Sequence, residues 1–186
     1  MQLLTCRLEF SQLVLIDLQT KLFAAMTEED RDRTLRTAKI LAQAAGGLGI
    51  PVMVTEQYPK GLGATEAEIL EKLPPLSKSM EKTGFSCCEA EGFRPMVEVN
   101  GRRQIVLAGQ ETHVCVLQSA FDLLRLGFQV FVVEDGVCSR NPAHKRNALD
   151  RMRQAGVVVT NLESVLFEWL ADSAHPQFKT LSALIR

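Results

Sequence analysis

The sequence of 186 residues lacks the features that mark membrane-spanning, secreted or nucleic-acid-binding proteins. It has no apolar run that approaches the roughly 20 residues needed to cross a bilayer. Its first residues, M-Q-L-L-T-C-R-L-E-F, have no basic segment ahead of an apolar one, so we expect no secretory signal peptide. Neither sign of charge is in excess, because 21 basic and 22 acidic side chains give a formal net charge of −1. A near-neutral chain argues against nucleic acid or an anionic membrane as the main partner.

Cysteine and histidine are too few and too scattered for a disulfide framework or a local metal motif. The cysteines are odd in number and form no C-x-x-C pair, which favours a reducing, cytoplasmic location; they are Cys6, Cys87, Cys88, Cys115 and Cys138. The histidines stand far apart, without the spacing of a zinc motif; they are His113, His144 and His175. Neither a G-x-G-x-x-G fingerprint nor a P-loop occurs. We therefore expect no metal and no cofactor.

Apolar runs alternate with amphipathic segments along the whole chain. Short apolar runs predict strands at 13–17, 51–55, 103–109, 128–133 and 157–160, with a weaker one at 79–82. Helical spacing predicts helices at 28–48, 64–73, 112–126, 142–156, 164–170 and 177–185. Such alternation is typical of a parallel sheet with helices on both faces. We expect one domain over residues 1–186, an α/β three-layer Rossmann-like sandwich around a six-stranded, mostly parallel sheet, with Asp135-Gly136 as a turn after the fifth strand.

Three reactive side chains are expected at the carboxyl ends of strands, where ligands bind in such sheets. Asp17 follows the apolar run L-V-L-I, so its carboxylate should be at least partly buried. A buried acid needs a partner or a raised pKa, so Asp17 is either half of an ion pair, a helix cap, or a general base. Lys82 is a candidate only as the cation beside Asp17 or beside the thiol of Cys115.

Cys115 is predicted in the first turn of helix 112–126. Cys115 is equally well interpreted as a buried residue of the core or as a nucleophile. The first interpretation follows because cysteine is among the most buried residue types. Unpaired N–H groups and the positive end of the helix dipole predict a lowered thiol pKa and a place for an oxyanion. His113 is two residues earlier and points about 200° away on a helix, so we expect a surface or subunit contact there.

Side chains after the second and third strands are candidates for substrate binding. Gln57 and Tyr58 follow the strand at 51–55, where they line either a pocket or a polar turn. Phe85 follows the strand at 79–82 and is the third candidate.

An ordered set of short motifs resembles the isochorismatase-like hydrolase superfamily in its cysteine hydrolase branch. The motifs are L-V-L-I-D-L-Q (13–19), V-M-V-T-E-Q-Y-P-K-G-L-G-A-T (52–65), M-E-K-T-G-F-S (80–86), V-L-A-G-Q-E-T-H-V-C-V-L (106–117), R-M-R-Q-A-G (151–156) and H-P-Q-F-K (175–179). Within the superfamily, T-E-Q-Y-P-K-G-L-G and H-P-Q-F-K are most similar to the isochorismatase domain-containing proteins.

The resemblance implies a catalytic triad and an oxyanion hole. D-L-Q places the acid at Asp17, E-K-T-G-F-S places the lysine at Lys82, and E-T-H-V-C places the nucleophile at Cys115. It also implies a cis peptide between Gln110 and Glu111, with the backbone N–H groups of Glu111 and Cys115 as the oxyanion hole. A homo-oligomer, dimer or tetramer, is expected on the same ground.

Two departures from the family narrow the chemistry. The nicotinamidase branch carries a metal-binding D-W-H-x-x-x-H-type segment after the second strand, where this chain has T-E-Q-Y-P-K-G, so zinc and nicotinamide are not expected. True isochorismatases lack the cysteine, whereas Cys115 is present here. The predicted function is therefore a cysteine hydrolase that cleaves a small amide-like C–N substrate through a thioester acyl-enzyme.

Two other functions stay open. A non-catalytic interaction protein could keep the fold and pocket of a hydrolase. A thiol redox protein could use Cys115 with Cys87 and Cys88, although the absence of C-x-x-C argues against it. The helix at 112–126 is apolar around much of its circumference, which indicates deep burial in the core or against a neighbouring chain.

Overall fold

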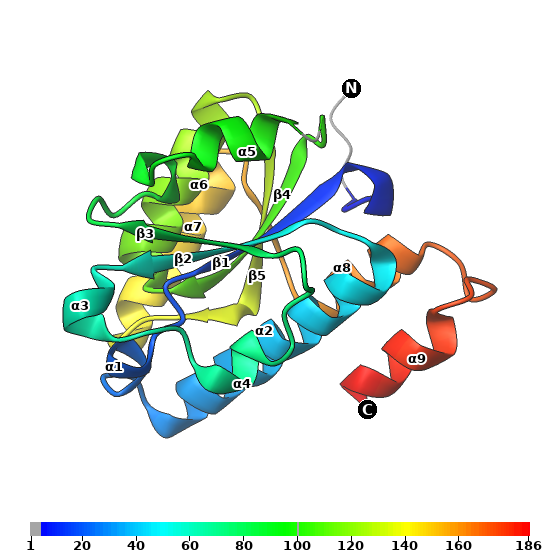
Figure 1. The fold of residues 1–186 in the computed structure, drawn as a ribbon, viewed down its shortest axis with the longest axis horizontal. Coiled ribbons are helices and arrows are strands. Elements are labelled where there is room, and N and C mark those ends of the chain that lie inside the picture. The colour runs from blue at the N-terminus through cyan, green and yellow to red at the C-terminus, as the bar shows by residue number, and fades with distance from the viewer. Residues whose placement is uncertain (1–4, 100) are drawn as a thin grey trace.

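One parallel sheet organises the chain, and the computed structural model describes residues 5–99 and 101–186 around it (Figure 1). Its six strands stand in the order β3-β2-β1-β4-β5-β6, and every neighbouring pair is parallel. The strands are β1 Ser11–Ile16, β2 Val52–Gln57, β3 Lys78–Lys82, β4 Gln104–Gln110, β5 Gln129–Cys138 and β6 Val158–Thr160. All six predicted strands are confirmed. The chain order reverses between β1 and β4, and ligands bind at the carboxyl ends of strands beside such a reversal.

Helices cover both faces of the sheet, as the sequence predicts (Figure 1). One face carries α2 Glu28–Leu48, α4 Ala67–Leu70, α8 Leu162–Leu170 and α9 Phe178–Ser182, and the other carries α5 Phe93–Val99, α6 Leu117–Arg125 and α7 Pro142–Gln154. Successive side chains of β1 alternate between the two cores: Leu13 and Leu15 belong to the first, Val14 and Ile16 to the second. Period-two alternation of wholly apolar residues is the pattern of a strand buried on both faces.

The long helix α2 begins and ends at its predicted residues. The side chain of Thr27 accepts a hydrogen bond from the N–H of Asp30 at 3.2 Å, and acidic residues fill the first turn. The helix stops at Gly49, whose φ of 67° is left-handed, a conformation that glycine adopts without steric penalty.

The fifth strand and the helix after β4 differ from their predictions. Asp135-Gly136 is no turn, because β5 continues through it to Cys138. The strand absorbs these residues through a shift in register against β4, whose Leu107 pairs with Val132 while Gly109 pairs with Val137. The helix expected at 112–126 is divided into a π-helical turn, Thr112–Val116, followed by α6.

The remaining differences between the predicted and the observed elements concern short helices. The helix expected at 64–73 is reduced to α4, and that expected at 177–185 becomes α9 followed by the 3-10 turn Ala183–Ile185. Three short helices were not predicted, α1 Thr20–Phe23, α3 Pro59–Leu62 and α5. Segments of four to seven residues are too short for apolar periodicity to identify.

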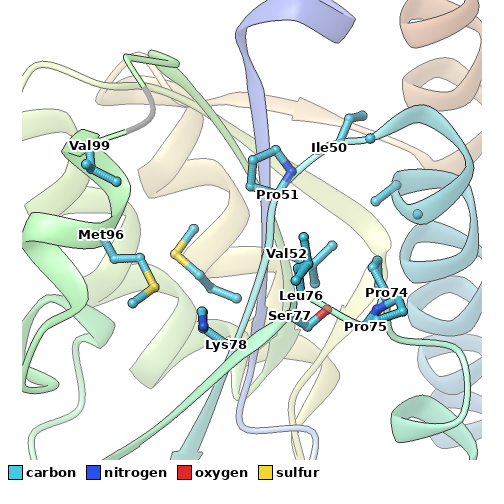
Figure 2. A pocket seen from close by; sticks show the side chains of 14 residues that line it. Ile50, Pro51, Val52, Pro74, Pro75, Leu76, Ser77, Lys78, Met96 and Val99 are labelled. Atoms are coloured by element: carbon cyan, nitrogen blue, oxygen red, sulfur yellow. The ribbon is translucent and has the colours of Figure 1, made fainter.

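The two ends of these strands differ in chemistry. The carboxyl ends of β1, β2 and β3 carry Asp17, Gln57 and Lys82, whereas an apolar cavity of about 660 Å³ lies at the amino ends of β2 and β3 (Figure 2). Within residues 5–99 and 101–186, no helix is long and apolar enough to cross a membrane.

Candidate active site

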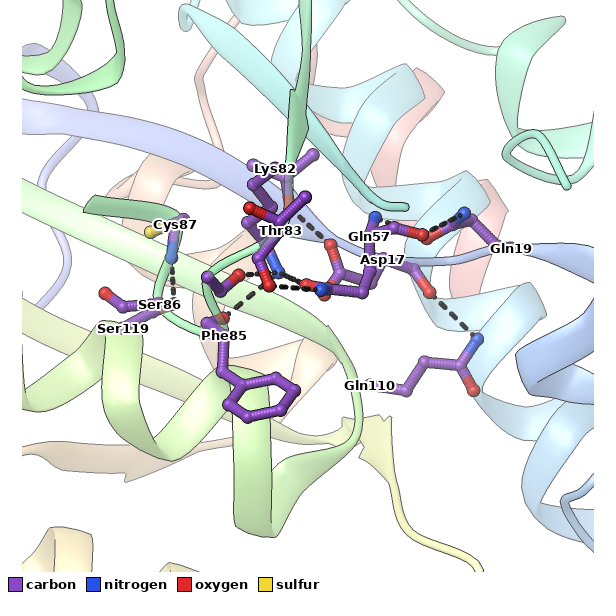
Figure 3. A network of polar contacts seen from close by, with 12 residues as sticks. Asp17, Gln19, Gln57, Lys82, Thr83, Phe85, Ser86, Cys87, Gln110 and Ser119 are labelled. Atoms are coloured by element: carbon purple, nitrogen blue, oxygen red, sulfur yellow. Dashed lines mark hydrogen bonds and ion pairs between the residues drawn. The ribbon is translucent and has the colours of Figure 1, made fainter. Parts of the chain in front are cut away.

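A buried ion pair joins the ends of β1 and β3 (Figure 3). The Nζ atom of Lys82 lies 2.6 Å from Oδ2 of Asp17, and neither side chain is exposed to solvent. β2 separates β1 from β3, so Lys82 reaches across the end of β2 to the carboxylate. The two predicted triad residues are thus in direct contact, although 65 positions apart in sequence.

The backbone of Asp17 turns its carboxylate toward Lys82. Its φ of 52° is left-handed, which aspartate tolerates better than most residues. The N–H of Asp17 donates to the carbonyl of Thr55 at 3.0 Å, and the hydroxyl of Thr55 donates to Oδ1 at 2.8 Å. The amide of Gln110 donates to the carbonyl of Asp17 at 3.1 Å. Both carboxylate oxygens are therefore occupied.

The ammonium group of Lys82 is fully coordinated by protein. Besides Asp17, it donates to Oε1 of Gln57 at 2.6 Å and to the carbonyl of Phe85 at 3.0 Å, with the carbonyl of Gly84 at 3.4 Å. A lysine ammonium has three protons to donate. Those protons are matched by the three shortest contacts, so Lys82 acts on its surroundings in this state mainly through its charge.

A second layer of amides holds Lys82 in place. Nε2 of Gln57 donates to the carbonyl of Thr83 at 2.7 Å, and its backbone N–H donates to Oε1 of Gln19 at 2.7 Å. Gln19 in turn donates to the carbonyls of Gln57 and Gly63, at 3.0 and 2.6 Å. Gln57, a predicted substrate-binding residue, thus has its side-chain amide engaged with Lys82 and Thr83.

Gln19 and Thr55 belong to this site but were not predicted. Both are fully buried, and both stand in segments that had been singled out, D-L-Q and V-T-E-Q. Their position at the end of an apolar strand is the signal that marks them, since a buried polar side chain requires a partner.

Cys115 completes the group from the π-helical turn after β4 and is 5% exposed. The charges of Asp17 and Lys82 both act on its thiol, in opposite directions. The predicted triad residues are therefore together at the carboxyl edge of the sheet.

The predicted fall in the thiol pKa is wrong. Burial and, next to it, the negative charge of Asp17 raise the pKa of Cys115 to about 12, and Lys82 acts against both. A helix terminus lowers a thiol pKa, but removal of the thiolate from water outweighs that contribution here. The thiol of Cys115 is thus neutral near pH 7.

Asp17 is suited to receive the thiol proton. Burial raises the pKa of its carboxyl, while the charge and hydrogen bond of Lys82, together with hydrogen bonds from Cys115 and Thr55, lower it. Desolvation outweighs the ion pair because a carboxylate removed from water loses more solvation than one cation restores. A carboxylate with a raised pKa is a stronger base than one at the surface.

The backbone ahead of Cys115 has the predicted cis peptide, between Gln110 and Glu111. The carbonyl of Glu111 accepts hydrogen bonds from the N–H groups of Val114 and Val116, at 3.0 and 3.2 Å. The side chain of Glu111 accepts from Arg140 through its Nε at 3.0 Å and its backbone N–H at 3.1 Å.

Tyr58 and Phe85, which follow β2 and β3, are exposed aromatic side chains, 55% and 53% accessible. Tyr58 and Lys82 line a cavity of about 390 Å³, whose rim also carries Glu81, Glu89 and Glu91. The side chains of Lys82 and Asp17 are not exposed to solvent, so the cavity lies beside the ion pair and does not open onto it.

His113 makes its polar contacts away from the triad. Its Nδ1 lies 3.0 Å from the hydroxyl of Ser139, and its ring lies 4.9 Å from that of His144. Burial lowers the pKa of His113, and the neighbouring His144 and Arg140 lower it too, against the effect of Glu111. In the described part of the chain, no group of three or more acidic, histidine or cysteine side chains could hold a metal ion. The cysteines of the described chain are all free thiols.

Comparisons with known proteins connect this site to a family. The isochorismatase domain model matches residues 11–164. Isochorismatase domain-containing protein 1 of Salmo salar is 44% identical over 146 residues, which cover 78% of this chain and 51% of that protein. The chain thus spans about half the length of that relative.

Two solved structures share the fold over almost the whole chain. That of the MAR1 ribonuclease from Caenorhabditis elegans has a TM-score of 0.90 at 36% identity, covering 97% of this chain and 92% of that chain. The YcaC gene product of Escherichia coli, described as an octameric hydrolase of unknown specificity, has a TM-score of 0.91 at 24% identity, covering 100% and 91%. At that lower identity the likeness establishes the fold alone.

Proposed function

Because the chain belongs to the isochorismatase domain family, we propose that it is a cysteine hydrolase that cleaves the C–N bond of a small amide-like substrate. The observation that carries the proposal is the buried Asp17–Lys82 ion pair acting on the thiol of Cys115. A cation and a base in direct contact, whose charges act on a nearby thiol, have the arrangement that nucleophilic catalysis needs.

In the first half of the reaction, Asp17 takes the proton of the Cys115 thiol as sulfur attacks the substrate carbonyl. A C–S bond forms, and the carbonyl oxygen becomes an oxyanion held by the backbone N–H groups of Glu111 and Cys115. The C–N bond then breaks, and the amine leaves with the proton from Asp17. A thioester between the acyl group and Cys115 remains.

In the second half, water attacks the thioester and gives a proton to Asp17. The C–S bond breaks, the acid product leaves, and the proton returns to sulfur. Lys82 stabilises the transient thiolate through its charge, since its protons are already donated to protein oxygens. Asp17 needs a pKa high enough to carry a proton between steps, which agrees with its burial.

The burial of Asp17, Lys82 and Cys115 favours a small substrate. The cavity beside β3, of about 390 Å³, is near the lower end of small-molecule sites, which span roughly 300–1,000 Å³. Tyr58 and Phe85 stand at the approach and are proposed to contact the substrate. Neither a metal nor a cofactor takes part in the steps above.

The decisive experiment compares wild type with Cys115→Ala on a panel of small amides, ureides and esters. The expected result is turnover by wild type and its loss in the variant, with the thioester adduct on Cys115 detected by mass spectrometry. Cys88→Ala is the matched control, because Cys88 is also a buried free cysteine but has no part in the proposed steps.

Two outcomes would favour the rival functions. Equal background rates for wild type and Cys115→Ala on every substrate would favour a non-catalytic interaction protein. A peroxide-dependent activity that wild type has and Cys88→Ala lacks, with no hydrolysis of any substrate by either protein, would favour thiol redox chemistry.

RNA is a second substrate class to test, because the similar Caenorhabditis elegans protein is described as a ribonuclease. A small molecule is favoured over RNA as the substrate, since the net charge of −1 gives little attraction for polyphosphate and the triad is buried. Cleavage of single-stranded RNA by wild type and not by Cys115→Ala would overturn this part of the proposal.

We also propose that the chain forms a homo-oligomer, a dimer or tetramer, in the cytoplasm. The exposed aromatic side chains of Tyr58 and Phe85 support association, and the free thiols support a reducing compartment. Sedimentation velocity at micromolar concentration and fractionation of the cells that make the protein test the two statements separately. A protein that stays monomeric would contradict the first.

A further inference from the structure

The hydroxyl of Ser119 joins the segment that follows Lys82 to the helix that follows Cys115. Ser119 is fully buried in α6, and its Oγ accepts a hydrogen bond from the N–H of Cys87 at 2.8 Å (Figure 3). Cys87 begins the 3-10 turn Cys87–Glu89 and is likewise fully buried. The proposed reaction gives Ser119 no step of its own, yet this contact connects two segments on which that reaction depends.

The N–H of Cys87 needs an acceptor from outside its own turn. An N–H at the start of a helical turn has no partner within that turn. The hydroxyl of Ser86 accepts a hydrogen bond from the N–H of Cys88 at 3.2 Å, so this local cap serves the neighbouring residue. A buried N–H without an acceptor is destabilising and rare in folded proteins. Ser119 therefore fixes the end of the segment against α6.

The same segment supplies backbone acceptors to the ammonium of Lys82. The carbonyls of Phe85 and Gly84 lie 3.0 and 3.4 Å from its Nζ. The start of the segment is held by β2, because Nε2 of Gln57 donates to the carbonyl of Thr83 at 2.7 Å. The acceptors of the ammonium thus lie between one attachment to β2 and another to α6.

Close packing transmits the attachment at Cys87 to these carbonyls. A Cβ on Gly84 would lie only 2.7 Å from Cβ of Glu89, so the segment packs directly on the 3-10 turn. A displacement of the turn would therefore displace the segment as well. The hydrogen bond to Ser119 consequently restrains the carbonyl of Phe85, which lies two residues before Cys87.

The position of Ser119 along its helix connects this restraint to the nucleophile. The π-helical turn that contains Cys115 passes directly into α6, and Ser119 is in the first turn of α6. Residues four apart lie about one turn from each other on the same side of a helix. One short stretch of chain thus carries both the thiol and the attachment of the segment that holds Lys82.

We propose that Ser119 is a positioning residue of the active site, which holds the Phe85 carbonyl and, through it, the ammonium of Lys82 in place beside Cys115. This inference rests on the proposed function, in which Cys115 is the nucleophile. Lys82 acts against the rise in the pKa of the Cys115 thiol, whose largest cause is burial. Coulombic attraction falls with distance, so an ammonium that is free to move away stabilises the thiolate less.

The test is the rate at which iodoacetamide labels Cys115 between pH 7 and 10, measured by peptide mapping of the full chain. Ser119→Ala is expected to slow this labelling about two- to tenfold across the range, the effect of one hydrogen bond on the thiolate fraction. Alanine is the strongest helix former, so α6 should remain folded, which far-UV circular dichroism checks.

A charge-free background separates positioning from a merely structural role. In the double variant Asp17→Asn with Lys82→Met, the further change Ser119→Ala should leave labelling of Cys115 within about twofold, because no ammonium remains to be positioned. Ser182→Ala is the matched control in the otherwise unchanged chain. Ser182 is also a buried serine, but it belongs to α9 on the opposite face of the sheet, and its substitution should leave labelling unchanged.

Hydrolysis gives a second readout once a substrate is found. Ser119→Ala should lower kcat by a factor similar to that seen in labelling and leave KM within about twofold, because Ser119 acts through Lys82 and does not touch the substrate. Labelling itself needs no substrate. Slower labelling in Ser119→Ala, in a protein that hydrolyses nothing, would support this inference and leave the proposed function unsupported.

Two outcomes would overturn the inference. One is labelling of Ser119→Ala at the wild-type rate, which would remove the positioning role even if wild type hydrolyses an amide. The other is the same slowing by Ser119→Ala in wild type and in the charge-free background, which would show that Ser119 supports the fold around Cys115 without acting through Lys82.

Discussion

The carboxylate of Asp17 acts on Cys115 in two opposite ways. Its negative charge raises the thiol pKa, which reaches about 12 in the buried site, yet its raised basicity lets it accept the thiol proton during attack. A substitution that removes the charge without changing the shape should separate these effects.

Asp17→Asn is expected to make Cys115 more reactive toward an alkylating agent and less active in hydrolysis. Lys82 then acts unopposed on the thiol, and each unit of fall in pKa raises the thiolate fraction about tenfold. Loss of the general base should lower hydrolysis about 10²- to 10⁴-fold. Iodoacetamide labelling at pH 8, followed by peptide mapping of Cys115, measures the first effect.

Asp150→Asn, a change of an exposed carboxylate in α7, is the control for this labelling experiment. Slower labelling in Asp17→Asn would contradict the assigned electrostatics. Labelling of wild-type Cys115 should also keep rising between pH 7 and 10 without a plateau, because its pKa of about 12 lies above that range.

Lys82→Met is expected to destabilise the protein more at pH 8 than at pH 5. The folded-state pKa of Asp17 is raised above its unfolded value, so stability from this group is present at low pH and is lost as pH rises through the folded pKa. Lys82 lowers the pKa of Asp17, so removal of Lys82 extends this loss of stability to higher pH. Once Asp17 is ionised, its buried charge then has no partner. The destabilisation near pH 8 should be about 3–5 kcal/mol.

Urea denaturation at the two pH values measures this difference, with Lys72→Met as the exposed control. The double variant Asp17→Asn with Lys82→Met should recover part of the stability, because neither buried charge remains. If Lys82→Met lowers the free energy of unfolding equally at pH 5 and pH 8, protonation of Asp17 does not compensate for the missing cation.

The triad could be predicted at the residue scale because each member stands at a strand end in a recognisable motif. The amide contacts of Lys82 could not, since they depend on how Gln57 and the loop of Thr83 to Phe85 fold over β3. The pKa of Cys115 was predicted in the wrong direction because local helix position does not reveal burial or the distance to Asp17.

At the scale of elements, β1 and β4 approach closely where Gly109 faces Ile16. The φ of Gly109 is +140°, and a Cβ there would lie 2.1 Å from the carbonyl oxygen of Ile16. That distance is far inside van der Waals contact with backbone atoms, which cannot move without displacing β1, the strand that precedes Asp17.

Gly109→Ala is therefore expected to destabilise the protein by at least about 3 kcal/mol, as overpacking at a fixed backbone does. Gly156→Ala is the matched control: its φ is +94° and its Cβ would meet nothing within 4 Å, so the loss should be about 1–2 kcal/mol. Urea denaturation compares the two, and equal losses would show that the strands adjust to the extra methyl group.

Period-two and helical patterns predicted the strands and long helices because burial on a regular element repeats at a fixed interval. The π-helical turn Thr112–Val116 could not be predicted, since its apolar residues fit an α-helix equally well. The extension of β5 through Asp135 and Gly136 could not be predicted either. Packing and not a turn requires Gly136, because a Cβ there would lie 2.9 Å from Thr37.

At the scale of the molecule, the two cores share the strands that divide them. β1 contributes Leu13 and Leu15 to one core and Val14 and Ile16 to the other. Unfolding of this strand therefore disrupts both cores at once. Helix α8 is joined to the first strand, because Nε1 of Trp169 in α8 donates to Oγ of Ser11 in β1 at 3.0 Å.

Residues 5–186 are therefore expected to unfold in one cooperative transition, although chains above about 150 residues often show intermediates. Trp169 is the single tryptophan and is buried against Ser11, so its fluorescence reports the joint between α8 and β1. Far-UV circular dichroism reports the helices on both faces. The two signals should give the same urea midpoint and slope within error, whereas a tryptophan transition at lower urea would mean that α8 separates before the sheet unfolds.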